Sequence, residues 1–317
     1  MKSNKNELDQ NSLIQISKSH KSKINTPFGY FGSKNKIAFQ ICRELPPHNC
    51  WIEAFCGSAA ITLVKAPAPI EIINDIDNQI VNFFEQLRTN EKELCRVVSL
   101  TPYSRQELSL ARSAKNSDSN VEKARRFLVQ SMMAINGVFG EERGGFSYSQ
   151  SYSRHNKEAR VNRWYNLPER LTEVAERLRS VRVENLDARK LLQMFSNRPA
   201  TLIYLDPPYF VDRTNGYDRD ENSEEFHREL LEIANESSCM MLISGYESEL
   251  YNSMLKSTKG WSRRSIETHT KDSKGRIHKR TEVLWMNKSF VKARKKGELP
   301  ITLTELEKKQ GKVNPVR

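Results

Sequence analysis

Short hydrophobic runs recur along most of the chain and are separated by amphipathic stretches. Apolar runs at 51–55, 70–75, 201–205, 239–244 and 282–286 have the length and composition of buried strands. Because both faces of such a run are apolar, each strand is expected to be covered on both sides.

The stretches between these runs predict helices. Residues 79–89 place Ile80, Phe83, Phe84 and Leu87 on one helical face. Helices are also expected at 58–64, 188–195 and 224–237, because apolar residues recur there with helical spacing. Strands separated by helices predict an α/β fold: a mostly parallel, Rossmann-like central sheet with helices on both faces.

Residues 101–180 interrupt this alternation. They are rich in arginine, serine, asparagine and aromatic residues, and we expect helices at 105–114, 120–134 and 167–180. We interpret 101–180 as a mainly helical inserted subdomain within a catalytic domain made of residues 25–100 and 181–290. Residues 1–24 and 291–317 are polar and basic and are predicted to be tails.

Three polar features stand at predicted strand ends, where an open parallel sheet binds its ligands. Gly57 follows the first strand, Asp75 ends the second, and Asp187 ends a strand near 182–186. Each has a simple structural alternative: a strand-to-helix turn for Gly57, and a helix cap for Asp75 (or its neighbour Asp77) and for Asp187. Taken together they favour a nucleoside-binding site.

Asp206-Pro207-Pro208-Tyr209 follows the apolar run at 201–205. Two prolines fix the backbone and remove two N–H donors, so the Pro207 carbonyl can face outward beside the Asp206 carboxylate. Two fixed acceptors suit an amine on a planar ring, and Tyr209 offers a flat face for stacking. The tetrapeptide therefore predicts chemistry on a planar amine.

Charge and cysteine content limit the cellular setting. The formal net charge is +12 and the isoelectric point about 9.4, which favours a polyanionic partner. The five cysteines form no C-x-x-C pair, so we expect a reducing cytoplasm, no disulfide framework and no metal site. No apolar run is long enough for a membrane span or a secretion signal.

The order of these segments resembles the Dam-like (alpha group) family of DNA adenine-N6 methyltransferases over most of residues 26–290. Residues 30–34, Tyr-Phe-Gly-Ser-Lys, are similar to the family's aromatic-x-Gly-x-Lys motif. Residues 53–59 are similar to its Glu-Pro-Phe-x-Gly-x-Gly loop, although Ala54 replaces the proline and Ser58, Ala59 and Ala60 stand where small glycines are usual. Residues 206–209 match its catalytic motif.

The resemblance implies a Rossmann-like methyltransferase fold, S-adenosylmethionine as cofactor and transfer of its methyl group to N6 of a flipped-out adenine. It implies a catalytic tetrapeptide at Asp206, Pro207, Pro208 and Tyr209. The lysine of the first motif would meet the cofactor carboxylate. The implied cofactor-binding set is Tyr30, Lys34, Glu53, Phe55, Gly57, Asp75, Asp187, Ala188 and Asp206.

Double-stranded DNA is the expected partner, read by the insert and by a basic stretch at 259–280 that resembles a hairpin or loop. The expected DNA contacts are Arg125, Asn136, Arg143, Tyr148, Arg154, Arg163, Lys271 and Arg276. Alternatives stay open: an RNA adenine methyltransferase, or a catalytically inactive relative that binds DNA. Cytosine N4 and protein glutamine are disfavoured by Asp206, because those enzymes usually carry serine or asparagine there. The target site, a cognate restriction endonuclease and the oligomeric state are not settled by the sequence.

Overall fold

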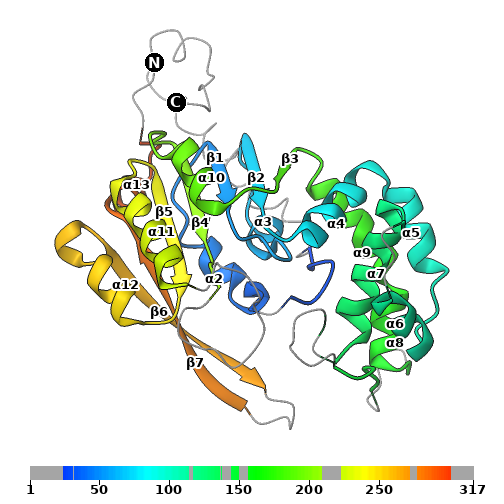
Figure 1. The fold of residues 1–317 in the computed structure, drawn as a ribbon. Coiled ribbons are helices and arrows are strands. Elements are labelled where there is room, and N and C mark those ends of the chain that lie inside the picture. Colours follow the sequence, from blue (N-terminus) through cyan, green and yellow to red (C-terminus); the bar gives the residue numbers. More distant parts are fainter. Residues whose placement is uncertain are drawn as a thin grey trace, which may run out of the picture.

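A computed structural model describes residues 24–30, 32–113, 117–135, 137, 144–149, 156–208, 223–271 and 277–300. In this part of the chain, seven strands form one sheet in the order β3-β2-β1-β4-β5-β7-β6 (Figure 1). Their bounds are β1 Cys50–Glu53, β2 Ile70–Asn74, β3 Val181–Glu184, β4 Thr201–Leu205, β5 Met240–Gly245, β6 Ser262–Lys271 and β7 Ile277–Met286.

Strands β1 to β5 run parallel, and only β7 reverses, pairing antiparallel with both β5 and β6. The predicted α/β fold with a mostly parallel sheet is therefore confirmed. The carboxyl ends of β1 to β5 meet at one edge of the sheet, and the antiparallel β7 passes the same edge with its register pair Gly245↔Val283. Polar residues at the carboxyl ends of β1 to β5 and on β7 can therefore lie close together at this edge.

Helices cover both faces of this sheet. Alternating residues of β4 divide between them: Ile203 and Leu205 pack in one apolar cluster, while Leu202 and Tyr204 pack in another. The first cluster includes side chains of α10 (Ala188–Phe195), α11 (Glu224–Glu236) and α12 (Glu249–Met254). The second includes those of α2 (Ala38–Cys42), α3 (Ala60–Val64) and α13 (Lys288–Lys296). Burial on both sides explains why these strands are apolar throughout.

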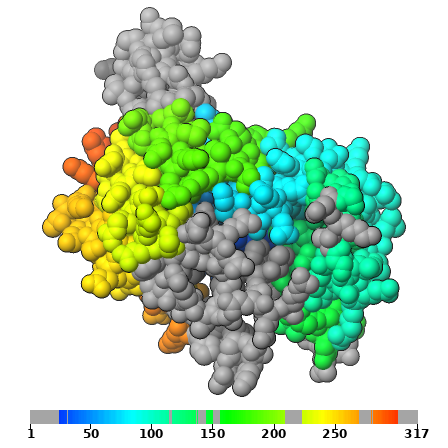
Figure 2. Space-filling model, in the orientation of Figure 1, coloured from blue at the N-terminus to red at the C-terminus, as the bar shows by residue number. Residues whose placement is uncertain are grey.

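A helical unit lies beside the sheet, in cyan and green in Figure 1 and on the same side of the molecule in Figure 2. It comprises α4 (Asn78–Thr89), α5 (Glu91–Ser99), α6 (Arg105–Arg112), α7 (Asn120–Met133), α8 (Ala159–Tyr165) and α9 (Leu167–Arg177). The helices predicted near 105–114, 120–134 and 167–180 are confirmed within a few residues. The short α5 and α8 were not predicted, and α5 extends the unit ahead of residue 101.

The basic stretch at 259–280 forms most of the β6–β7 hairpin, in which two strands of ten residues each project from the edge of the sheet (Figure 1). Of the two expectations for this stretch, a hairpin or a loop, the antiparallel pairing of β6 with β7 fits the hairpin. A 3-10 turn, η3 (Ser257–Lys259), leads into it, and another, η1 (Lys34–Lys36), precedes α2. In the described ranges, no helix has the length and apolar character needed to cross a membrane.

The predicted C-terminal tail was wrong at its start. Helix α13 continues to Lys296, because Phe290 and Ala293 are buried against the sheet and Asn287 caps the helix through the amide of Phe290. The predicted tail residues 1–23 and 301–317 lie outside the described part of the chain.

Candidate functional site at the carboxyl edge of the sheet

The loop after β1 contacts two other predicted site residues. The amide of Gly57 donates to Oδ2 of Asp75 at 2.8 Å. Gly57 has a φ of +47°, and a Cβ placed there would lie 2.8 Å from the Tyr30 ring. Glycine is therefore required on two grounds: a left-handed backbone and an aromatic ring against it. Tyr30, Gly57 and Asp75 form one side of the site.

Asp75 is buried at the end of β2 and orders the chain around it. Its second oxygen, Oδ1, accepts from the amide of Asp77 at 2.9 Å. The helix cap considered as an alternative for Asp75 belongs to Asp77, whose side chain accepts from Gln79 at the start of α4.

Asn74 was not predicted from the sequence to be a site residue. Its side chain forms hydrogen bonds that connect the end of β2 with the segments that follow β1 and β3. Its side-chain amide donates to the carbonyls of Ala54 and Leu186, and its Oδ1 accepts from the amide of Leu186. Asn185 adds a bond to the carbonyl of Asp75. The signal available in the sequence was an amide residue directly at a strand end, beside the predicted acid.

Glu53 was predicted to bind the cofactor, but in this structure its carboxylate is directed to the chain itself. It is buried and accepts from the amides of Thr62 and Ile61 and from the Thr62 hydroxyl. Burial raises the pKa of Glu53 to about 7. Glu53 thereby holds the loop and the first turn of α3, where Ala59 adopts a left-handed conformation with φ 55° at the position of the usual second glycine.

Asp206, at the end of β4, forms the centre of a buried polar network. Nζ of Lys34 donates to its two oxygens at 2.6 and 2.7 Å and lies 3.6 Å from Glu282. The Ser244 hydroxyl donates to Oδ1 of Asp206 at 3.0 Å and also bonds Tyr204. Elements far apart in the sequence therefore converge on this one carboxylate.

The role predicted for Lys34 was a contact with the cofactor carboxylate, whereas the contact present here is with Asp206. Burial by itself would lower the pKa of Lys34, but the carboxylates of Asp206 and Glu282 outweigh it, so that the pKa is raised. Lys34 is thus a fixed cation between two acids. Ser244 and Glu282 are network members whose contacts the sequence could not specify.

The third strand-end acid, Asp187, caps a helix. It accepts from the amide of Arg189 at the start of α10 and forms an ion pair with the same arginine at 2.5 Å, which lowers its pKa. Arg189 also lies 4.8 Å over the ring of Phe226, and that ring packs edge-on against Phe55. The predicted residues Phe55 and Asp187 therefore lie on one side of the site, next to the buried Ala188.

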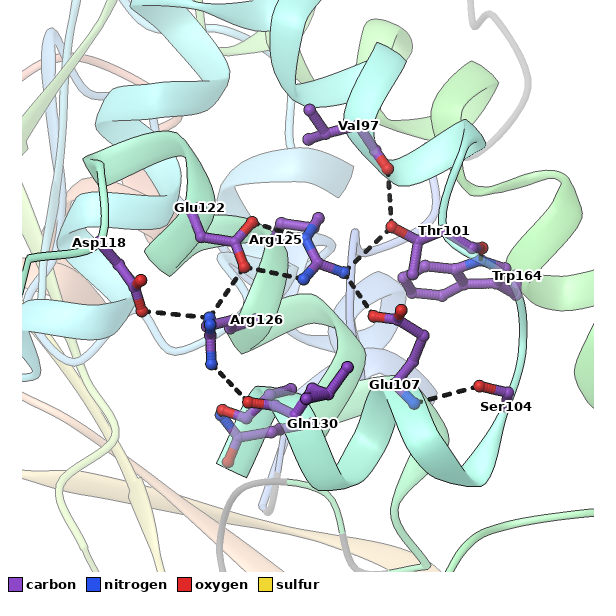
Figure 3. A network of polar contacts seen from close by, with 12 residues as sticks. Val97, Thr101, Ser104, Glu107, Asp118, Glu122, Arg125, Arg126, Gln130 and Trp164 are labelled. Atoms are coloured by element: carbon purple, nitrogen blue, oxygen red, sulfur yellow. Dashed lines mark hydrogen bonds and ion pairs between the residues drawn. The ribbon is translucent and has the colours of Figure 1, made fainter. Parts of the chain in front are cut away.

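Arg125 was predicted to contact DNA, and its surroundings do not support that role. Its guanidinium donates to Glu122, Glu107 and Thr101 inside the helical unit, as Figure 3 shows. Its side chain is 13% exposed. With its donors directed to acids of α6 and α7, Arg125 is a packing residue rather than a DNA contact.

Two other predicted DNA contacts are placed differently. Tyr148 is exposed, and the guanidinium of Arg105 lies 5.7 Å from the centroid of its ring and 5.0 Å from that of Phe146. Arg163 lies close to Gly29, and among the described residues it forms no ion pair. Burial and the like charges of Arg170 and Arg160 lower its pKa.

The remaining predicted site residues lie outside what the structure describes: Tyr209, Asn136, Arg143, Arg154, Arg276 and the side chain of Lys271. Within the described ranges, no cluster of three or more histidine, cysteine, aspartate or glutamate side chains could hold a metal ion.

The sequence was also compared with known protein families, and one family matches. The sequence model of the D12 class N6 adenine-specific DNA methyltransferases matches residues 30–274, which include every described residue of the site at the carboxyl edge of the sheet except Glu282. No curated relative matches the chain.

Two solved structures share low similarity with the chain. One, a candidate RNA methyltransferase from Pyrococcus horikoshii, has a TM-score of 0.36 at 9% identity, covering 88% of this chain and 97% of that one. The other, a precorrin 8w decarboxylase from Methanobacterium thermoautotrophicum, has a TM-score of 0.33 at 8% identity, covering 80% and 89%. Neither carries an argument about function.

Proposed function

Because this chain belongs to the D12 class N6 adenine-specific DNA methyltransferase family, we propose that it is a site-specific, Dam-like enzyme of the alpha group. It transfers a methyl group from S-adenosylmethionine to N6 of an adenine flipped out of double-stranded DNA. One observation carries this proposal: the Asp206 carboxylate at the end of β4, fixed by Lys34 and Ser244 and followed by two prolines.

The chemistry follows from the acceptors at 206–207. The Asp206 carboxylate and the Pro207 carbonyl would accept the two N–H bonds of the exocyclic amine, which leaves the nitrogen lone pair toward the methyl donor. Asp206 would also stabilise the positive charge that develops on N6. Lys34 and Ser244 fix the carboxylate before the substrate arrives, so little reorganisation is needed.

The residues at the other strand ends fit the cofactor. Asp75 places a carboxylate at the end of β2 for ribose hydroxyls, Gly57 allows close approach of the backbone, and Phe55 and Asp187 flank the place for an adenine. Tyr30 packs on the same loop. When bound, S-adenosylmethionine supplies an electrophilic methyl group on a positively charged sulfur. A site with several carboxylates suits that charge.

DNA would be held by the helical unit and the hairpin. Flipping an adenine out of the duplex costs a few kcal/mol, which contacts to the phosphates and the displaced stack must offset. Arg163 lacks an acidic partner among the described residues and is suited to a phosphate. Tyr148, with its exposed ring, is suited to stacking.

The test is expression in a bacterium without adenine methylation, followed by long-read mapping of N6-methyladenine. We expect one modified DNA motif with the wild-type chain and none with Asp206→Ala, which should keep most of its DNA binding. Glu93→Ala, a change at an exposed acid of α5, should modify the same motif as the wild type. A genome without any modified motif, or full activity of Asp206→Ala, would contradict the proposal. Methylation of the cells' RNA alone would favour the RNA alternative.

A further inference from the structure

Two buried hydroxyls lie in line behind the Asp206 carboxylate. Tyr204 stands two positions before Asp206 at the end of β4, and residues two apart along a strand point to the same face. Ser244 lies on the neighbouring strand β5, one step beyond the register pair Leu205↔Ile243. Tyr204 and Ser244 are buried, whereas the side chain of Asp206 is 17% exposed. The two hydroxyls are therefore on the core side of the carboxylate.

The direction of both hydrogen bonds follows from the acceptor at the end of this line. Asp206 holds the Lys34 ammonium between its two oxygens, as an ionised carboxylate does, and such a group only accepts. The Ser244 hydroxyl, 3.0 Å from Oδ1, must therefore give its single proton to Asp206. The Tyr204 hydroxyl, 2.7 Å from Oγ of Ser244, is then the donor in the second bond. Burial and the Asp206 charge raise the pKa of Tyr204, so its hydroxyl keeps the proton that it donates.

Packing of the ring fixes the position of the Tyr204 hydroxyl. The ring lies nearly parallel to that of Trp51 on β1, with an interplanar angle of 11° and centroids 6.1 Å apart. The indole is itself held, because its Nε1 donates to the Thr62 hydroxyl at 2.8 Å. Both rings are buried. The donor to Ser244 is therefore in place before any ligand binds.

The hydrogen-bond chain from Tyr204 through Ser244 makes the two oxygens of Asp206 different. Oδ1 accepts from both Lys34 and Ser244, which uses the two lone pairs of a carboxylate oxygen. Among the described residues, Oδ2 accepts from Lys34 alone. Each bond of such a chain also polarises the next, so donation by Tyr204 strengthens the bond from Ser244 to Oδ1.

We propose that Tyr204 is a positioning residue for methyl transfer: it holds the Ser244 hydroxyl on Oδ1 of Asp206 and thereby leaves Oδ2 as the acceptor for the target amine. This inference rests on the proposed function of Asp206. It assigns a role to a buried tyrosine that does not itself reach the substrate.

Tyr204→Phe tests the hydrogen-bond chain because it removes one oxygen and keeps the ring that stacks on Trp51. We expect the single-turnover rate of methyl transfer to fall about tenfold, since misplaced catalytic groups lower rates by up to roughly 100-fold. The cofactor concentration that gives half the maximal rate should change little. Ser244→Ala should lower the rate at least as much. The double variant Tyr204→Phe/Ser244→Ala should be no slower than Ser244→Ala, because Tyr204 acts only through Ser244.

Tyr251→Phe is the matched control. It also removes a buried tyrosine hydroxyl, but that hydroxyl lies 2.9 Å from Nδ1 of His227 and not at Ser244, so the rate should stay near that of the wild type. The readouts are the single-turnover rate with tritiated S-adenosylmethionine and unmethylated plasmid DNA, and urea unfolding. Losses of rate that multiply in the double variant would overturn the proposal, as would an equal loss of rate in Tyr251→Phe.

The unfolding measurements separate this proposal from the proposed function. A wild-type chain that methylates no DNA contradicts the proposed function. The hydrogen-bond chain is still tested in that case, because residues in direct contact lose unfolding free energy non-additively when both are substituted. Additive losses for Tyr204→Phe and Ser244→Ala would show that the two hydroxyls are not coupled and would overturn the chain itself.

Discussion

The sheet edge and the helical unit both contain buried charge, but they organise it in opposite ways. At the sheet edge, Lys34 meets Asp206 and Glu282, which come from three distant parts of the sequence. In the helical unit, Arg125 pairs with Glu122 three residues away on the same helix and with Glu107 of the neighbouring helix (Figure 3). The first network leaves the Asp206 carboxylate partly exposed, whereas the second satisfies its own groups. Under the proposed function, similar chemistry therefore serves catalysis in one region and packing in the other.

Removing the cation from the sheet-edge network should have the largest effect. Lys34→Met leaves two buried carboxylates facing each other without compensation, a change of about 3 kcal/mol or more. We expect methylation to fall more than about 100-fold, measured as kcat/KM with tritiated cofactor and unmethylated plasmid DNA. Lys36→Met removes an exposed charge from the same 3-10 turn and should retain activity. Near-normal activity of Lys34→Met would remove the distinction between the two networks.

The next largest difference between the two regions is expected in how their buried acids make stability depend on pH. The pKa of Glu53 is raised from 4.5 to about 7, so the folded chain keeps a proton that the unfolded chain releases. This stabilising contribution is present below pH 4.5 and is lost as the pH rises to 7. From pH 5 to 7, the wild type should therefore lose roughly 2 kcal/mol of stability relative to Glu53→Gln, in urea unfolding.

Glu122 is the matched control for that titration. Its hydrogen bond with Arg125 lowers its pKa, so its contribution is present above pH 4.5 and is lost only at lower pH. Glu122→Gln and the wild type should differ by a constant amount between pH 5 and 7. If both variants differed from the wild type by the same pH-dependent amount, the pH dependence could not be assigned to the raised pKa of Glu53.

Arg125→Met should destabilise the helical unit by about 2 kcal/mol, because Glu107 and Glu122 lose their shared partner while they are partly shielded from water. Urea unfolding measures this. Arg96→Met, which breaks an exposed pair with Glu93, should leave stability nearly unchanged, because water screens that pair. If Arg125→Met instead weakens DNA binding with no loss of stability, Arg125 is a DNA contact after all.

The smallest expected effect tests the fit between Tyr30 and the loop. Gly57→Ala and Gly32→Ala both place alanine at a positive φ, +47° and +73°, but only Gly57 has a ring against it. The excess loss of cofactor affinity in Gly57→Ala, measured by calorimetry, should be about 1 kcal/mol beyond that in Gly32→Ala. Adding Tyr30→Ala should remove the excess, and equal losses in the two glycine variants would rule out the contact.

The sheet and its site were predictable because topology made the motif positions informative. In a parallel sheet, residues that end different strands must meet at one edge, so Gly57, Asp75 and Asp206 could be grouped before any contact was known. The periodicity of apolar residues predicted most helices for the same reason: a buried face needs a regular spacing.

What could not be predicted depends on side-chain geometry. An arginine on a helix looks the same in the sequence whether it meets a phosphate or two glutamates, which is why Arg125 was misassigned. Lys34 contacts Asp206 because the segment before α2 lies next to the end of β4, and the sequence does not show how close these two segments are. Asn74 was overlooked because a single amide residue has no spacing pattern of its own.

In the sequence, the helical unit lies between β2 and β3, which are neighbours in the sheet. This order affects how the chain folds. Glu71 of β2 pairs in register with Val181 of β3, 181 − 71 = 110 positions later. Closing so large a loop in an unstructured chain is entropically unfavourable, and long-range parallel pairing forms slowly. If the intervening helices associate first, they bring the two strand ends together and shorten that search. We therefore expect β3 to join the sheet late in refolding, after the helices that separate it from β2 have packed.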